Sequence, residues 1–170
     1  LDVLVPYGDP VRDFTFHRAE SHSLFWLTAA SPFLAALPAR LHRAAGIAFR
    51  QWWLLAWLAL VTHALLDAFT VYGTQILRPF TDFPYAIGSV FIIDPLYTVP
   101  LLIGIGVALA LRSDKGWRWN LAGLIVSALY LGWGVLAQHH VLQVARDSLK
   151  AQGIEAVHLL ATPTAFNSIL

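Results

Sequence analysis

Long apolar stretches, separated by short polar segments, dominate the chain. A helix needs roughly 20 residues to cross about 30 Å of hydrocarbon. Three apolar stretches meet that length, namely residues 52–72, 87–111 and 119–138. A fourth, residues 23–38, is shorter and contains Pro32 and Pro38. This segment is either a full span whose helix begins near His17 or a re-entrant segment buried in protein.

The pattern predicts an all-α fold, a multi-pass transmembrane bundle of about four membrane segments in residues 1–138. Residues 139–170 differ, because charged side chains intersperse with apolar ones up to about residue 162. That mixture is typical of an amphipathic, non-spanning helix, and Gly153 predicts a break in it. The alternative, core helices of a soluble all-α protein, is disfavoured by the length and purity of the apolar stretches.

The composition agrees with lipid as the main solvent. Of the 170 residues, 58% are hydrophobic and 12% are charged, whereas about a quarter of a soluble domain is charged. A net charge of +1 and the lack of a basic run give no indication of nucleic-acid binding. Cysteine is absent, so disulfides and thiolate metal sites are excluded. Any metal site must therefore use His, Asp and Glu.

Two short basic loops, residues 40–50 and 112–118, predict the orientation in the membrane. The positive-inside rule places both loops in the cytoplasm, and tryptophans flank them as interfacial anchors. Residues 1–22 then lie outside. Seven ionisable residues are expected on this non-cytoplasmic side: His17, His22, His63, Asp67, Asp94, His139 and His140. If residues 23–38 are re-entrant, the two loops no longer determine the absolute side, but the later spans keep their relative arrangement.

A histidine and two aspartates fall inside the predicted spans. His63 and Asp67 are spaced i, i+4, so they share one face of a helix. Ionisable groups within a span are costly and indicate a functional site by default. A divalent cation can neutralise such carboxylates, and imidazole with carboxylate suits zinc, manganese or iron. The alternatives are a structural His63–Asp67 pair, and an Asp94 that only caps a helix beginning at Pro95.

The polar stretch HRAESH contributes two further histidines before the first apolar segment. His17 and His22 are spaced i, i+5, so a loop or helix break is needed to direct both rings at one centre. Asp2 is another acid expected on the same side. For His139 and His140, in contrast, a solvated position at the end of a span is favoured over a role in metal binding. The convergence of so many ligand-type residues on one side nevertheless favours a metal site.

Four blocks of the sequence, in order, resemble the YdjM-type membrane-bound, metal-dependent hydrolases, a family of inner-membrane-associated hydrolases. The blocks are LDVL, HRAESHSLFW, HALLDAFTVYGTQILRPF and IIDPLYTVPLL. The resemblance implies a multi-pass bacterial inner-membrane protein with a His/Asp metal site and hydrolytic activity. By motif position, the metal ligands it implies are Asp2, His17, His22, His63, Asp67 and Asp94.

The chain departs from the family pattern at two points. Relatives usually carry a Pro-Asp pair and an N-terminal helix before the first aspartate, and Asp2 has neither before it. We therefore expect a fragment that lacks this helix. Where relatives have a small or aromatic residue between the two histidines, this chain has Glu20, a carboxylate able to bind metal or move protons.

The favoured function is a metal-dependent hydrolase that holds one or two divalent ions, zinc first, at the membrane–water boundary. Asp94 or Glu20 is the expected general base, and Arg18 or Arg78 the expected clamp for an anionic group. A site at this depth suits a membrane lipid, such as a phospholipid or a lipid-linked phosphoester, although a small-molecule substrate is also open. Nothing in the sequence indicates an oligomeric state.

Two other classes of function remain open. Intramembrane His and Asp also serve transporters and proton or ion relays, and Pro95 and Pro100 fit a broken helix. The small number of spans, the absence of an inverted repeat and the one-sided clustering of polar residues count against that class. A non-catalytic membrane scaffold is the third possibility.

Overall fold

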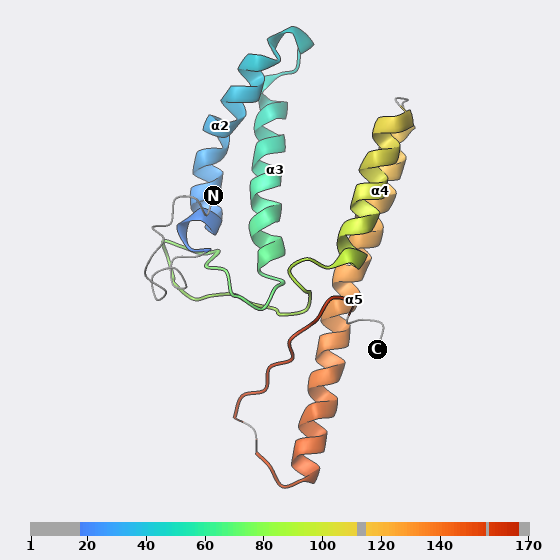
Figure 1. Ribbon diagram of the computed structural model, residues 1–170. Helices are drawn as coiled ribbons and strands as arrows, with labels where there is room; N and C mark the ends of the chain where they lie inside the picture. The colour runs from blue at the N-terminus through green and yellow to red at the C-terminus, as the bar shows by residue number, and fades with distance from the viewer. Residues whose placement is uncertain (1–17, 112–114, 156, 167–170) are drawn as a thin grey trace, which may run out of the picture. The chain divides into compact units, whose positions relative to one another are not determined.

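A computed structural model describes residues 18–111, 115–155 and 157–166. Throughout these ranges the regular secondary structure is helical, which confirms the all-α prediction (Figure 1). The α-helices are α2 (Leu24–Leu41), α3 (Phe49–Asp67), α4 (Pro95–Leu111) and α5 (Gly116–Ala151). The chain divides into two compact units, Leu1–Ala86 and Ile87–Leu170. Helices α2 and α3 form the first unit, and α4 and α5 form the second.

Two of these helices, α2 and α5, are long and apolar enough to cross a membrane. Helix α2 begins at Leu24, after a short 3-10 helix over Glu20–His22, and continues through both of its prolines. Helix α4 is apolar but has only 17 residues. The described helices thus support a membrane protein, and the total of about four spans stays a prediction.

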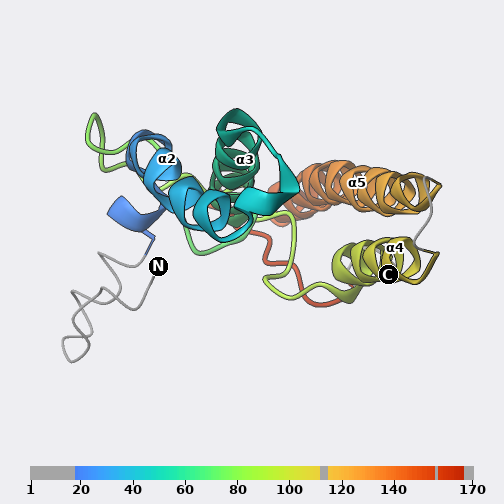
Figure 2. The ribbon, with the colours of Figure 1, turned by 90° about the horizontal axis from the view of Figure 1, so that it is seen from above.

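In the first unit, α2 and α3 lie side by side (Figure 2). Small residues and indole hydrogen bonds form their contact. Trp53 Nε1 donates to Ser31 Oγ at 2.8 Å, and Trp57 Nε1 donates to Thr28 Oγ1 at 3.1 Å. Ser31 and Ala35 of α2 are fully buried. Hydroxyls on one helix thus satisfy the indole N–H groups of the other, as apolar surroundings require.

The chain beyond α3 returns to the start of α2 and fixes the polar stretch that precedes it. Gln75 N donates to Arg18 O, and Leu24 N donates to Ile76 O, each at 3.0 Å. Ser23 caps α2, because its Oγ accepts a hydrogen bond from Trp26 N at 3.3 Å. These bonds hold the segment from Arg18 to Ser23 between the start of α2 and the segment that follows α3.

In the second unit, α4 and α5 approach closely at glycines. A Cβ atom added at Gly104 would lie 2.8 Å from Trp119 O, and one added at Gly123 would overlap the carbonyl of Pro100. Ser127 Oγ also donates to Tyr97 O at 2.7 Å across the pair. Small residues at such a contact let two backbones approach, which is how helices associate in lipid.

We expect Gly123→Val to destabilise the α4–α5 pair by about 1–3 kcal/mol, because the added side chain overlaps the backbone of α4. The check is the thermal unfolding midpoint of the purified protein in detergent. Gly132→Val is the matched control, since a Cβ added at Gly132 meets no atom within 4 Å. Equal shifts for the two variants would contradict the close packing at Gly123.

Two expected spans begin or end elsewhere. The expected span 52–72 forms a helix only to Asp67, and α4 begins at Pro95, whereas 87 was expected. Asp94 Oδ1 accepts a hydrogen bond from Leu96 N at 3.0 Å, so Asp94 caps α4 and does not lie within it. The predicted helix cap at Asp94 is therefore present, and it does not decide whether Asp94 has a further role.

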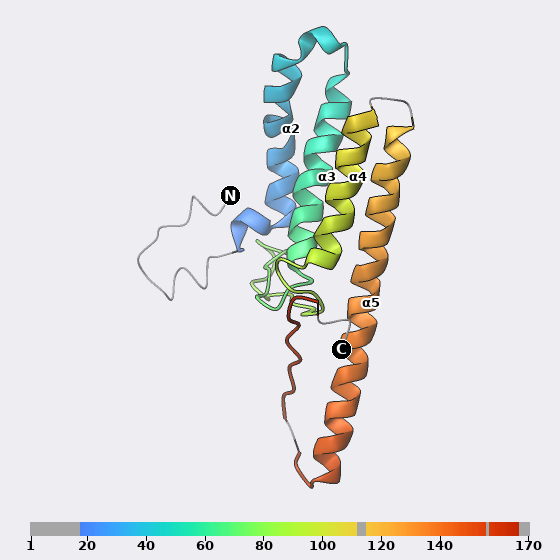
Figure 3. The same cartoon turned by 45° about the vertical axis from the view of Figure 1, so that its right-hand side comes forward.

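Helix α5 continues well past the predicted fourth span. Residues 119–138 and the first part of the tail form one helix that ends at Ala151, just before Gly153, which has a φ of 73°. The positive φ of this glycine ends the helix where the sequence predicted a break. Figure 3 shows that the following extended segment runs back along α5.

Candidate metal centre

Three of the predicted metal ligands meet in the first unit. His22 comes from the 3-10 helix before α2, and His63 and Asp67 lie one turn apart at the end of α3. His22 Nε2 lies 2.9 Å from Asp67 Oδ2 and 3.1 Å from His63 Nε2. The candidate ligand atoms of all three lie within 4.8 Å of one another. The i, i+4 spacing that the sequence shows therefore directs both α3 side chains at one point.

The distances and donor types fit a divalent ion. Tetrahedral zinc with ligands at about 2.0–2.1 Å places neighbouring ligand atoms roughly 3.3 Å apart. The separations of 2.9 and 3.1 Å from His22 Nε2 are close to that spacing. His22 Nδ1 lies 2.9 Å from Ser21 Oγ, which orients the ring so that Nε2 faces the centre. Three protein ligands leave a coordination position open, as in catalytic sites.

Arg18 supplies a positive charge beside Asp67. No basic residue lies close to Asp67 in the sequence, so this contact depends on the fold. Its Nε lies 3.5 Å from Asp67 Oδ2, and its Nη1 donates to Thr70 Oγ1 at 2.8 Å. Its guanidinium also lies 5.0 Å from the centre of the Tyr72 ring. The side chain is buried, and the backbone has a φ of 58°. These contacts position Asp67, and the role of Arg18 as an anion clamp stays a prediction.

Glu20 is exposed and pairs with a cation of its own. Its Oε1 lies 3.0 Å from Arg78 Nη2, and the same guanidinium lies 3.3 Å from Asp82 Oδ1. Glu20 is thus not part of the His22–His63–Asp67 cluster. Its role as a general base stays a prediction.

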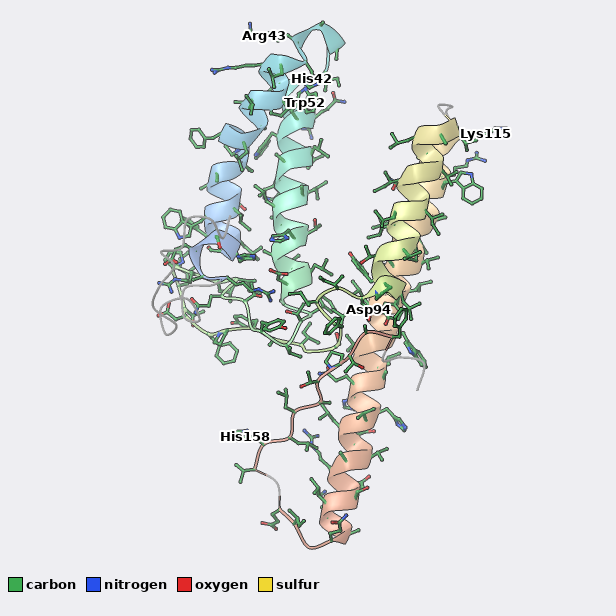
Figure 4. All side chains as sticks on the ribbon, in the orientation of Figure 1. His42, Arg43, Trp52, Asp94, Lys115 and His158 are labelled. Atoms are coloured by element: carbon green, nitrogen blue, oxygen red, sulfur yellow. The ribbon has the colours of Figure 1, made fainter. Side chains whose placement is uncertain are left out.

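Asp94 belongs to the second unit, at the start of α4 beside α5 (Figure 4). Besides capping α4, its carboxylate accepts a hydrogen bond from Tyr130 OH at 2.8 Å. Its roles as metal ligand and as general base stay predictions. Asp2 and His17 lie outside the described residues.

The other described histidines do not belong to the His22–His63–Asp67 cluster. His42 is at the α2–α3 turn, at the other end of the helix pair from His22, as its place in the basic loop predicts (Figure 4). His139 and His140 are exposed on α5. Their exposure agrees with the solvated alternative.

Several residues around these groups were not predicted as part of a site. Thr70 and Tyr72 hold Arg18, and Ser21 orients His22. All three lie inside the blocks that carry the family resemblance. Their polar side chains within these blocks could therefore have identified them as candidate site residues. Tyr130, the partner of Asp94, lies in an uncharged apolar stretch that gave no such signal.

The chain was compared with proteins of known sequence and structure. No solved structure is significantly similar to it. The "Uncharacterized protein YfhP" of Bacillus subtilis (strain 168) is 34% identical over 95 residues, which is 54% of this chain and 27% of that protein. The chain thus spans well under half of that relative's length. The sequence profile of the YdjM inner membrane protein family matches residues 1–141, most of the chain, and the protein belongs to this family.

Proposed function

We propose that the protein is a metal-dependent hydrolase of the bacterial inner membrane, with His22, His63 and Asp67 as metal ligands. The family and two helices long enough to span a membrane support the location. The observation that carries the proposal is the convergence of two imidazole nitrogens and one carboxylate oxygen within 4.8 Å. Membership of the family is compatible with hydrolysis.

Each residue of the cluster has a definite task. His22 and His63 offer imidazole nitrogens, and Asp67 offers a carboxylate oxygen, a combination that suits a divalent cation. When bound there, a divalent ion supplies Lewis acidity, which polarises a phosphoryl or acyl oxygen and makes water more acidic. Arg18 and Thr70 hold Asp67 and its helix end in place, because the guanidinium bridges the two.

Glu20 is the carboxylate we assign as general base. It is exposed, so it is accessible to water, and it lies two residues from His22 in the same 3-10 helix. Its partner Arg78 holds the carboxylate at 3.0 Å, and a carboxylate held in this way can accept a proton from water.

A phospholipid or another lipid-linked phosphoester is the proposed substrate class. The first unit has a groove of about 470 Å³ whose lining is almost entirely apolar, which suits an acyl chain. One lining residue, Leu24, is two positions after the candidate ligand His22 in the sequence. Arg78 also lines the groove and offers a cation that could bind a phosphate group. The residues that line it are Leu24, Phe25, Thr28, Ala29, Ile76, Leu77, Arg78 and Phe80.

Metal analysis of the purified protein tests the proposal. We expect about one or two divalent ions per chain, zinc first, and loss of hydrolysis of a phospholipid or phosphoester panel after chelation. Activity should return when the ion is restored. A protein purified under metal-replete conditions without a stoichiometric ion would contradict the proposal and favour a proton or ion relay.

A further inference from the structure

The second unit contains a pocket of about 620 Å³. Residues from the segment before α4, from the middle of α5 and from residues 161–163 line it. Its polar lining consists of Ser89, Asp94, Gln138, His140 and Thr162, and its aromatic lining consists of Tyr130 and Trp133. The remaining walls are mostly apolar or small residues.

Asp94 places a buried negative charge at this pocket. The residue is 3% exposed, and its carboxylate accepts hydrogen bonds from Leu96 N and Tyr130 OH, both neutral donors. None of the ion pairs among the described residues involves Asp94. Burial of a carboxylate without a countercharge is costly, so a cationic ligand would stabilise this arrangement.

Two further acceptors line the same pocket. Ser89 Oγ is buried and has no hydrogen-bond partner among the described residues. Gln138 donates through Nε2 to Gly88 O at 2.7 Å, which leaves its carbonyl Oε1 to accept. Because a buried hydroxyl without a partner is uncommon, Ser89 indicates a group that the described residues do not supply.

We propose that this pocket binds a ligand through a primary ammonium group. An –NH₃⁺ group carries three donors, and Asp94, Ser89 and Gln138 offer three acceptors. Its positive charge compensates Asp94, and the aromatic lining by Tyr130 and Trp133 suits a cation. A quaternary ammonium group has the charge but no donor, so it would leave Ser89 unpaired. The proposed site does not depend on the hydrolase function.

Binding of ethanolamine to the full chain in detergent, followed by calorimetry, tests the site. We expect Asp94→Asn, which retains the helix cap, to weaken binding at least about tenfold, because a charged hydrogen-bonded pair is lost. Ser89→Ala should weaken ethanolamine binding a few-fold. This variant should leave the fold intact, because Ser89 Oγ makes no hydrogen bond with the described residues. Asp147→Asn, at an exposed position on α5, removes the same charge and should leave binding unchanged.

A second experiment distinguishes a lipid headgroup from a soluble amine as the source of the ammonium group. Nanodiscs containing phosphatidylethanolamine are compared with nanodiscs of phosphatidylglycerol alone, and a chemical-shift or fluorescence change confined to the former assigns the group to a lipid headgroup. Binding of free ethanolamine alone assigns it to a soluble amine. No binding in either arm, or choline binding as tightly as ethanolamine, would overturn the proposal. A fall in metal content in Asp94→Asn would also overturn it, because Asp94 would then serve the ion.

Discussion

Replacement of both His63 and Asp67 by alanine is expected to remove the metal ion and the hydrolytic activity together. These residues supply two of the three ligand atoms that converge within 4.8 Å, so only His22 would remain. Even the loss of an outer-shell partner costs 10–100-fold in metal affinity, and we expect the loss of two ligands to cost at least about 100-fold. Metal content by mass spectrometry and hydrolysis by the same preparation measure the effect.

The double variant His139→Ala, Asp147→Ala is a matched control. It also removes one histidine and one aspartate, but from exposed positions on α5. We expect it to keep wild-type metal content and activity. Full metal content in His63→Ala, Asp67→Ala would refute the assignment of the site, whereas retained metal with lost activity would separate metal binding from catalysis.

The apolar pattern predicted the helices well and their ends less well. Hydropathy averages over a window, so it registers residues 87–94 as part of an apolar stretch. Local backbone chemistry instead determines that α4 begins at Pro95, with Asp94 as its cap, and that Gly88 has a φ of 69°. The Asp-Pro pair was visible in the sequence and was the correct signal for this boundary.

The core of the candidate site was also predictable, whereas its electrostatics were not. The i, i+4 spacing and the order of the blocks single out His63 and Asp67 and add His22, and the structure brings the three together. The ion pair between Arg18 and Asp67 depends on a left-handed residue and on backbone bonds between segments far apart in the sequence. Neither feature leaves a periodic pattern in the chain.

Replacement of Arg18 by alanine is expected to destabilise the metal-free protein strongly. Arg18 is 6% exposed and lies against Asp67, so its loss leaves a partly buried carboxylate with His22 as its remaining partner. Loss of one member of a buried pair costs about 3–5 kcal/mol, and we expect the lower end of that range because His22 remains. Thermal unfolding of the chelated protein in detergent measures the loss.

A divalent ion should offset much of this loss, because it supplies the positive charge that Asp67 then lacks. The metal-induced rise in the unfolding midpoint is therefore expected to be larger in Arg18→Ala than in the wild-type protein. Arg18→Gly separates side chain from backbone. It removes the same ion pair, but glycine adopts the φ of 58° without strain, so it should be more stable than Arg18→Ala by about 1 kcal/mol. Equal metal-induced shifts in all three proteins would show that Arg18 does not act through the charge of Asp67.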